Sequence, residues 1–119
     1  MSVEDQLLLW FIKERVPADA VCHGDPPFQY RFYQSYFDLL VETKSEFWIV
    51  EAERNSNDTT IYKALGQLLF YQYLWKTYKD NADEKQLRLI CLCPDECSEH
   101  AEKFLANHNV EFVKGNLQR

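Results

Sequence analysis

Two neighbouring segments rich in strand-forming residues constrain the fold of this chain more than any other part of it. Residues 31–42 and 47–53 are dense in aromatic and β-branched side chains. The four polar residues between them, 43–46, suit the loop of a β-hairpin. A loop of this length predicts antiparallel strands in which Glu42 lies opposite Phe47, and this pair fixes all the others.

That register divides the side chains of the hairpin between its two faces. One face carries an uninterrupted apolar set that we expect in the core: Phe37, Leu39, Val41, Trp48, Val50 and Ala52. The other face carries Asp38 directly opposite Glu51, together with Glu53. Because Leu40 and Ile49 share this second face, we expect a helix to cover it and to leave the carboxylates at its open end.

Three carboxylates on one face need an explanation, because like charges directly opposite each other destabilise a sheet. A divalent cation between them is one solution. Mg²⁺ prefers carboxylate oxygens and often takes only one or two of them, with water and phosphate oxygens as its other ligands. A cation held in this way polarises a phosphoryl group and lowers the pKa of an attacking water. The alternative is that the carboxylates simply cover the exposed face of a half-buried sheet.

Residue periodicity predicts the elements around the hairpin. They are a helix over 3–15 capped by Ser2, an irregular stretch over 17–30 with a short strand near 20–22, a helix over 59–79 capped by Asp58 or Thr59, a loop over 80–86, a strand over 87–93, a helix from 94 or 95 to about 107, and a strand over 109–113. This order predicts an α/β fold with a mixed sheet of about four to five strands flanked by helices. A length of 119 residues predicts a single domain over 1–119.

The long helix over 59–79 carries a buried stripe and a polar face. The stripe consists of Ile61, Leu65, Leu68 and Trp75. Lys63, Gln67 and Tyr71 follow one another at i, i+4 and i+8 on a different face, where a lysine can stabilise phosphoryl charge and a glutamine can position water. A solvated polar face explains the same spacing more simply. Gly66 costs a helix about 1 kcal/mol relative to alanine, which suggests close packing against the sheet or access to a site.

Three stretches resemble the core of the PD-(D/E)xK, or restriction-endonuclease-like, nuclease superfamily. They are Tyr-Phe-Asp-Leu-Leu at 36–40, Trp-Ile-Val-Glu-Ala-Glu at 48–53, and Ala-Leu-Gly-Gln-Leu-Leu-Phe-Tyr at 64–71. The resemblance implies a restriction-endonuclease-like αβββαβ core with a mixed sheet. It also implies a metal-dependent endonuclease that hydrolyses phosphodiester bonds of nucleic acid, with DNA favoured over RNA.

Carried over by position, the resemblance implies that Asp38 and Glu51 hold Mg²⁺ or Mn²⁺. Glu53 stands where the superfamily usually has a lysine that orients or activates water, and it becomes a further metal ligand or water-orienting group. Some members keep glutamate there. In other branches the lysine has moved to the neighbouring helix, where Lys63 is found.

Two more residues match weaker features of the superfamily. Gln67 resembles a glutamine often found in that helix, and Glu4 resembles an additional acidic residue of several branches. The helix dipole also favours an acid in a first turn, which explains Glu4 equally well. The missing lysine and a net charge of −6 support an alternative: an inactive module of the same fold that binds a protein or nucleic-acid partner. A chain this small offers limited surface to a duplex, which favours a homodimer or a partner subunit.

The remaining sequence features concern the compartment and the cysteines. No stretch approaches the roughly 20 apolar residues that cross a bilayer, and the acidic start lacks the basic region of a signal peptide, so we expect a cytoplasmic protein with no membrane contact. Cys91, Cys93, Cys97 and His100 are four potential zinc ligands within ten residues. Their place in an apolar strand and the helix after it favours buried free thiols over zinc.

Overall fold

A mixed sheet lies at the centre of this computed structural model, which describes residues 1–24, 29–79 and 85–117. The elements are α1 (Val3–Arg15), β1 (Val21–His23), β2 (Tyr30–Phe32), β3 (Ser35–Phe37), β4 (Leu39–Glu42), β5 (Glu46–Ala52), α2 (Asp58–Tyr78), β6 (Gln86–Cys93), α3 (Glu99–Asn107) and β7 (Val110–Lys114). Within the described ranges, five strands form one sheet in the order β1-β4-β5-β6-β7, and β2 and β3 form a separate ribbon.

The direction of each strand follows from its connection. The hairpin strand β4 runs antiparallel to β1 and β5, whereas β6 and β7 follow helical crossovers and run parallel to their neighbours. Along the chain, the main elements are α1, β1, β4, β5, α2 and β6, which is the expected αβββαβ order. The predicted fold class is therefore confirmed. The predictions for 17–30 and 80–86 include residues 25–28 and 80–84, which lie outside the described residues.

The register of the central hairpin is the predicted one. Glu42 pairs with Phe47, and Leu39 pairs with Val50. The Thr43 side chain helps to close the loop, because its Oγ1 accepts a hydrogen bond from the Glu46 N–H at 2.9 Å. The alternation of faces from 39 to 42 and from 47 to 50 is confirmed.

The prediction of one continuous strand over 31–42 is wrong. Tyr33 and Gln34 adopt left-handed φ angles of 47° and 65°, which form the tight turn between β2 and β3. The chain then bends at Asp38 before β4 begins. This break changes the face of Phe37, which packs in the cluster that contains Leu40 and not in the one that contains Leu39.

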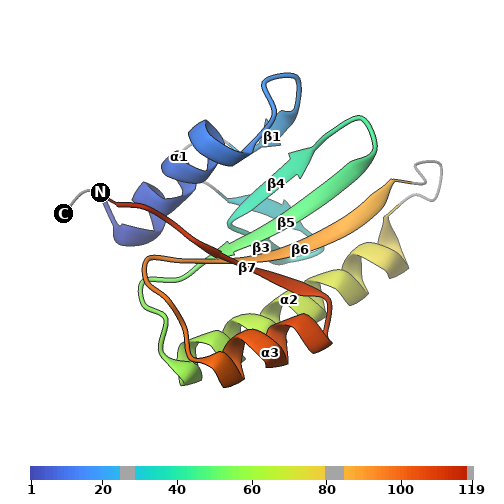
Figure 1. Ribbon diagram of the computed structural model, residues 1–119. Helices are drawn as coiled ribbons and strands as arrows, with labels where there is room; N and C mark the ends of the chain where they lie inside the picture. The colour runs from blue at the N-terminus through green and yellow to red at the C-terminus, as the bar shows by residue number, and fades with distance from the viewer. Residues whose placement is uncertain (25–28, 80–84, 118–119) are drawn as a thin grey trace.

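Helices cover both faces of the sheet (Figure 1). α1 contributes Leu7, Leu8 and Phe11 to the cluster on one face, and Val50 of β5 packs in the same cluster. The opposite face packs against α2 and α3. The predicted stripe is buried there, with exposures of 0% to 6%: Ile61, Leu65, Leu68 and Trp75. Burial on both faces explains why the central strands are continuous apolar runs.

The helix caps differ in part from the expected ones. Ser2 caps α1 as predicted, and its Oγ accepts from the Asp5 N–H at 3.1 Å. The N-cap position of α2 is held by Asn57, whereas Asp58 or Thr59 was predicted there. The side chain of Asn57 makes no capping hydrogen bond. The predicted start of the last helix at 94 or 95 is wrong, because Ser98 caps α3 through the Ala101 N–H.

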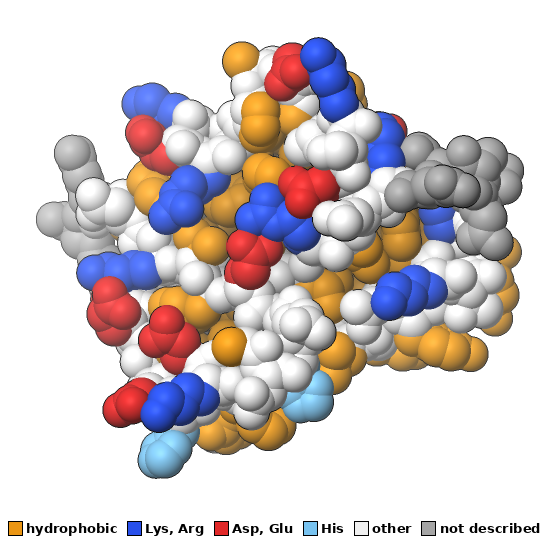
Figure 2. Space-filling model, turned by 45° about the vertical axis from the view of Figure 1, so that its right-hand side comes forward, with side chains coloured by type: hydrophobic (Ala, Val, Ile, Leu, Met, Phe, Trp, Pro, Cys, Tyr) orange, Lys and Arg blue, Asp and Glu red, His pale blue; other side chains and the backbone are white. Residues whose placement is uncertain are grey.

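The surface combines charge pairs with exposed apolar groups. On the face shown in Figure 2, basic and acidic side chains lie beside one another. Arg88 and Glu111 form an ion pair between the neighbouring strands β6 and β7, and Lys85, just before β6, pairs with Glu42 at the end of β4, each at 2.7 Å. Among the described residues, no helix is both long enough and apolar enough to cross a bilayer.

Candidate functional site

The carboxylates predicted as a site line one cavity of about 340 Å³. Asp38 comes from the bend before β4, Glu51 from the end of β5, and Glu53 from the residues just after it. Glu4 of α1 and Gln67 of α2 line the same cavity. Because α1 and α2 cover opposite faces of the sheet, the acidic cavity lies where both helical layers meet the end of β5.

Asp38 is held in place by the neighbouring strand. Its Oδ2 accepts a hydrogen bond from the Ala52 N–H at 2.9 Å. The strand pairing ends at Leu39 and Val50, so the predicted direct opposition of Asp38 and Glu51 is replaced by this contact with the backbone of β5. Burial raises the pKa of Asp38 to about 6. The bond from Ala52 lowers this pKa in part, and the charge of Glu4 raises it.

Glu51 is the one charged side chain that is buried among the residues described, with 8% exposed. Its Oε2 is inaccessible to solvent and has no hydrogen-bond partner in those ranges. Burial, followed by the charges of Asp38 and Glu53, raises the pKa of Glu51 to about 9. Such a group needs either a proton or a cation, because a buried polar atom without a partner costs about 1–3 kcal/mol and more when charged.

Glu53 and Glu4 also line the cavity. Burial, followed by the charges of Asp38 and Glu4, raises the pKa of Glu53 to about 7. The Glu53 N–H donates to the Leu92 carbonyl at 2.9 Å, which holds this residue beside β6. Glu4 also carries a buried oxygen, Oε1, that no described group satisfies.

The polar face predicted on α2 divides between two environments. Gln67 lines the acidic cavity and also an adjoining cavity of about 290 Å³, whereas Lys63 lines only the adjoining one. Tyr71 is buried against Phe37, with 4.9 Å between the ring centroids. Burial, followed by the charge of Glu51, raises the pKa of Tyr71 to about 12.

Gly66 does not mark a close approach. A Cβ added there would have no neighbour within 4 Å, and the residue is exposed. The expectation that it packs tightly against the sheet is therefore wrong, because α2 turns this position outward.

The donor set fits a hard divalent cation. No group of three Asp, Glu, His or Cys side chains in the described ranges is already arranged as a metal-binding cluster. A cation that takes one or two carboxylates does not require such a cluster. Oε2 of Glu51 is a buried oxygen without a partner, and Asp38 has one oxygen beyond the bond to Ala52, so these two residues are the first candidates.

The cysteines form a separate, buried feature. Cys91 and Cys93 are free and buried, with 3.7 Å between their Sγ atoms, and Cys97 is half-buried. The hydrogen bond with Cys93 and burial raise the pKa of Cys91. The predicted burial of these two residues is confirmed, and neither forms a disulfide in the described ranges. Cys91 pairs with Glu51 across β5 and β6, so it lies beside one residue of the acidic cavity.

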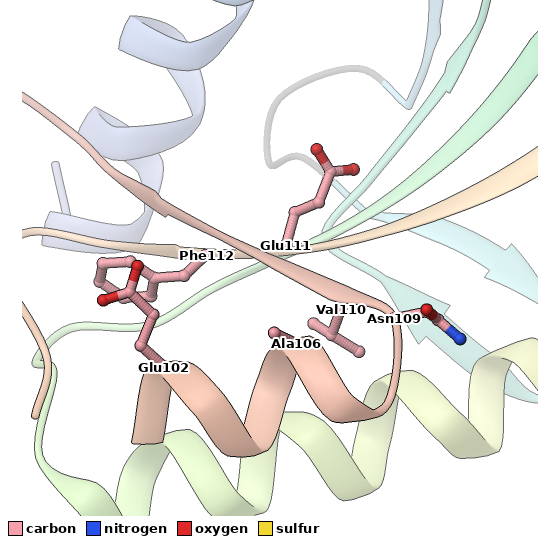
Figure 3. A pocket seen from close by; sticks show the side chains of 6 residues that line it. All are labelled: Glu102, Ala106, Asn109, Val110, Glu111 and Phe112. Carbon is pink, nitrogen blue, oxygen red and sulfur yellow. The ribbon is translucent and has the colours of Figure 1, made fainter. Parts of the chain in front are cut away.

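Another cavity, of about 490 Å³, lies between α3 and β7 (Figure 3). Val110 points toward α3, whereas Glu111 points away from it and binds Arg88 through two hydrogen bonds of 2.7 and 2.8 Å. This cavity shares no lining residue with the acidic one. We find no catalytic arrangement among its lining residues.

Sequence reasoning missed two charged residues of the region. Asp5 lines the acidic cavity and raises the pKa of Asp38, and Arg54 lines the adjoining cavity. Each directly follows a residue that was singled out, Glu4 or Glu53. That adjacency was the only available signal, because α1 and the residues after β5 come together only in the folded chain.

Comparisons with known proteins identify relatives of the fold only. No family model and no curated protein matches the sequence. An XisH family protein from Nostoc punctiforme PCC 73102 is similar in structure, with a TM-score of 0.59 and 14% identity over 95% of this chain and 90% of that one. An fdxN element excision controlling factor protein from Anabaena variabilis has a TM-score of 0.53 and 13% identity, over 94% and 88%. The chain therefore shares its α/β fold with these two proteins.

Proposed function

We propose that this chain is a Mg²⁺- or Mn²⁺-dependent nuclease that hydrolyses phosphodiester bonds of nucleic acid, DNA in preference to RNA. The observation that carries the proposal is the buried oxygen of Glu51, which has no partner among the described residues and belongs to a residue that lines one cavity with Asp38 and Glu53. Desolvated like charges of this kind are frequent at catalytic sites, where a substrate or cation compensates them.

Asp38 and Glu51 would hold the cation. Asp38 is suited to this because the Ala52 N–H fixes one of its oxygens and leaves the other available. When bound, the cation would polarise the phosphoryl group and make the attacking water more acidic.

Glu53 would bind as a further ligand or orient that water. It lines the same cavity as Asp38 and Glu51, so its carboxylate can accept a hydrogen bond from that water. A glutamate in this place can thus take over the water-orienting role of the expected lysine.

The helix α2 would supply the contacts to the substrate. Gln67 reaches both cavities and can position water or a phosphate oxygen. Lys63 lies in the adjoining cavity, where its charge can offset that of the phosphate in the transition state.

The fold comparison gives modest support. The name of one similar structure assigns control of the excision of the fdxN element to that protein. A nuclease function for this chain would be consistent with a fold that also occurs in a protein named for the control of element excision.

The test combines metal binding with cleavage. Titration calorimetry should detect Mg²⁺ or Mn²⁺ binding to the wild-type protein, and cleavage of plasmid, single-stranded DNA or RNA should require the metal. Asp38→Ala and Glu51→Gln should lose both, with cleavage falling at least 100-fold. Glu14→Gln, on the exposed side of α1, is the matched control and should keep both. Cleavage that persists in Glu51→Gln would refute the proposed site.

The second candidate is a module that binds a protein or nucleic-acid partner without catalysis. Glutamate in place of the usual lysine at position 53 favours it. Its expected result is the absence of metal binding at millimolar concentrations together with retained partner binding. In either case we expect a homodimer or a partner subunit, and sedimentation with and without duplex DNA tests this expectation.

A further inference from the structure

The cavity that adjoins the acidic one has a different charge. It shares Glu4, Glu53 and Gln67 with its neighbour, and it adds Arg54 and Lys63. The lining of the acidic cavity includes no lysine or arginine in the part of the chain that the structure describes. Among the residues described, the acidic cavity is therefore lined by carboxylates without cations, whereas the adjoining cavity balances Glu4 and Glu53 with Arg54 and Lys63.

The two cations, Arg54 and Lys63, are not engaged in ion pairs with the described residues. Neither Arg54 nor Lys63 forms an ion pair within 4.0 Å with any residue in the described ranges, and both are exposed. Elsewhere, cations such as Lys85 and Arg88 are engaged by carboxylates at 2.7 Å. Their charges are thus available to an anion in this cavity.

The backbone at the start of α2 adds donors. Asn55 Oδ1 accepts from the Asn57 N–H at 3.0 Å, and Ser56 Oγ donates to the Asp95 carbonyl at 2.6 Å, so the loop that carries Arg54 is fixed. The side chain of Asn57 makes no capping hydrogen bond to the first turn of α2, which also carries Asp58. Thr60 of that first turn lines the cavity. The start of a helix favours an anion, and here it lies beside the two cations.

We infer that this cavity binds one phosphate group of a nucleic-acid strand, next to the phosphodiester group that reaches the acidic cavity. Arg54 and Lys63 supply the charge, and the Thr60 hydroxyl and the Asn55 amide can donate further hydrogen bonds. The identity of the strand rests on the proposed function, whereas the affinity for phosphate rests on the cavity itself. Local cations would let a protein of net charge −6 hold a polyanion in one orientation.

The test measures binding without metal, so that cleavage does not enter the result. Fluorescence anisotropy of a labelled oligothymidylate, in chelator and over a series of salt concentrations, gives both Kd and its salt dependence. Arg54→Gln should raise Kd roughly tenfold, the effect of losing one charge-assisted hydrogen bond. The slope of log Kd against log salt should fall by about 0.7, the value for one phosphate contact on a single strand.

Matched controls separate the cavity from general surface charge. Arg31→Gln removes an exposed arginine of β2 that has no ion pair in the described ranges, and Lys76→Gln removes an exposed lysine of α2, outside this cavity. Lys63→Gln should behave like Arg54→Gln, and the two controls should keep the wild-type Kd and slope. Equal losses in all four variants, or no loss in Arg54→Gln, would overturn the inference. Thermal melting should show that each variant is folded.

A competition experiment shows whether the bound phosphate belongs to a nucleic acid or to a free phosphate ligand. Pyrophosphate should displace the oligonucleotide from the wild-type protein, and it should bind Arg54→Gln more weakly. Binding of pyrophosphate without any binding of the oligonucleotide would overturn the assignment to nucleic acid and indicate a free phosphate ligand. Metal-dependent cleavage with an unchanged slope in Arg54→Gln would refute only this cavity. A changed slope without cleavage would refute only the proposed catalysis.

Discussion

Glu51 links the acidic cavity to the stability of the chain. Its pKa in the fold, about 9, lies above the ordinary glutamate value of 4.5, so between these pH values the folded state holds a proton that the unfolded state has released. Stability therefore decreases as pH rises through this range. Asp38 and Glu53, with pKa values near 6 and 7, act in the same direction.

The first prediction follows from this decrease of stability with rising pH. In chelator, the free energy of unfolding of the wild-type protein should fall by roughly 2 kcal/mol or more between pH 5 and pH 7, at about 1.4 kcal/mol per pH unit for each group that titrates. Glu51→Gln should flatten this dependence and be more stable than the wild type at pH 8. Urea unfolding at several pH values measures it, with Glu14→Gln as control. Stability that is flat or rises with pH in the wild type would contradict the burial of Glu51.

Asp38 permits a second prediction, because the effect of its charge on stability can be separated from that of its hydrogen bond with Ala52. Asp38→Asn keeps an oxygen that can accept from the Ala52 N–H and removes the charge, so it should stabilise the cation-free protein at pH 8. Asp38→Ala removes the acceptor as well and should be less stable than Asp38→Asn by about 1–3 kcal/mol, the cost of leaving a buried donor unsatisfied. Denaturation in chelator compares them. Equal stability of the two variants would show that the bond to Ala52 contributes nothing.

At the scale of elements, α2 contains a glycine whose replacement should increase the stability of the protein. Gly66 lies in the interior of this helix, and an added Cβ would meet nothing within 4 Å. Gly66→Ala should therefore stabilise the protein by about 1 kcal/mol, measured as a higher urea midpoint. Gly115→Ala is the informative contrast, because its Cβ would collide with the fully buried Leu7. We expect it to destabilise by about 1–3 kcal/mol. A loss of stability in Gly66→Ala would contradict the open surface of α2.

The central hairpin could be predicted because its information is local. The loop at 43–46 and the alternation on either side of it set the register, and the helices over 3–15 and 59–79 followed from their own periodicity. The small ribbon of β2 and β3 could not be predicted in this way. Tyr33 and Gln34 form its turn without glycine, at φ values that their type does not indicate.

Contacts with residues that are distant in sequence explain why that ribbon forms. The ring of Phe32 lies 5.0 Å from that of Trp75, and the ring of Phe37 lies 4.9 Å from that of Tyr71. Burying these aromatic side chains against α2 compensates for the strained turn. The same limit applies to the candidate site. Its carboxylates followed from the hairpin, but only the folded chain brings Arg54 and Lys63 into one cavity.

At the scale of the whole molecule, β5 joins the two helical layers. Its residues alternate between the cluster with α1 and the cluster with α2, as Val50 and Ile49 do. Neither layer can separate without exposing one face of this strand. The two clusters should therefore lose their structure together, although they contain different side chains.

The last prediction tests this cooperativity and, with it, the single domain expected over 1–119. Leu8→Ala in the α1 layer and Leu68→Ala in the α2 layer should each cost about 2–5 kcal/mol, because both side chains are almost completely buried. Each variant should still unfold in one transition. Near-ultraviolet circular dichroism reports on Trp48 in one layer and Trp75 in the other, and far-ultraviolet dichroism reports on the helices. If Leu8→Ala instead released α1 in a separate early transition, the sheet with α2 and α3 would be the cooperative unit. The acidic cavity, to which α1 contributes Glu4, would then open before the core unfolds.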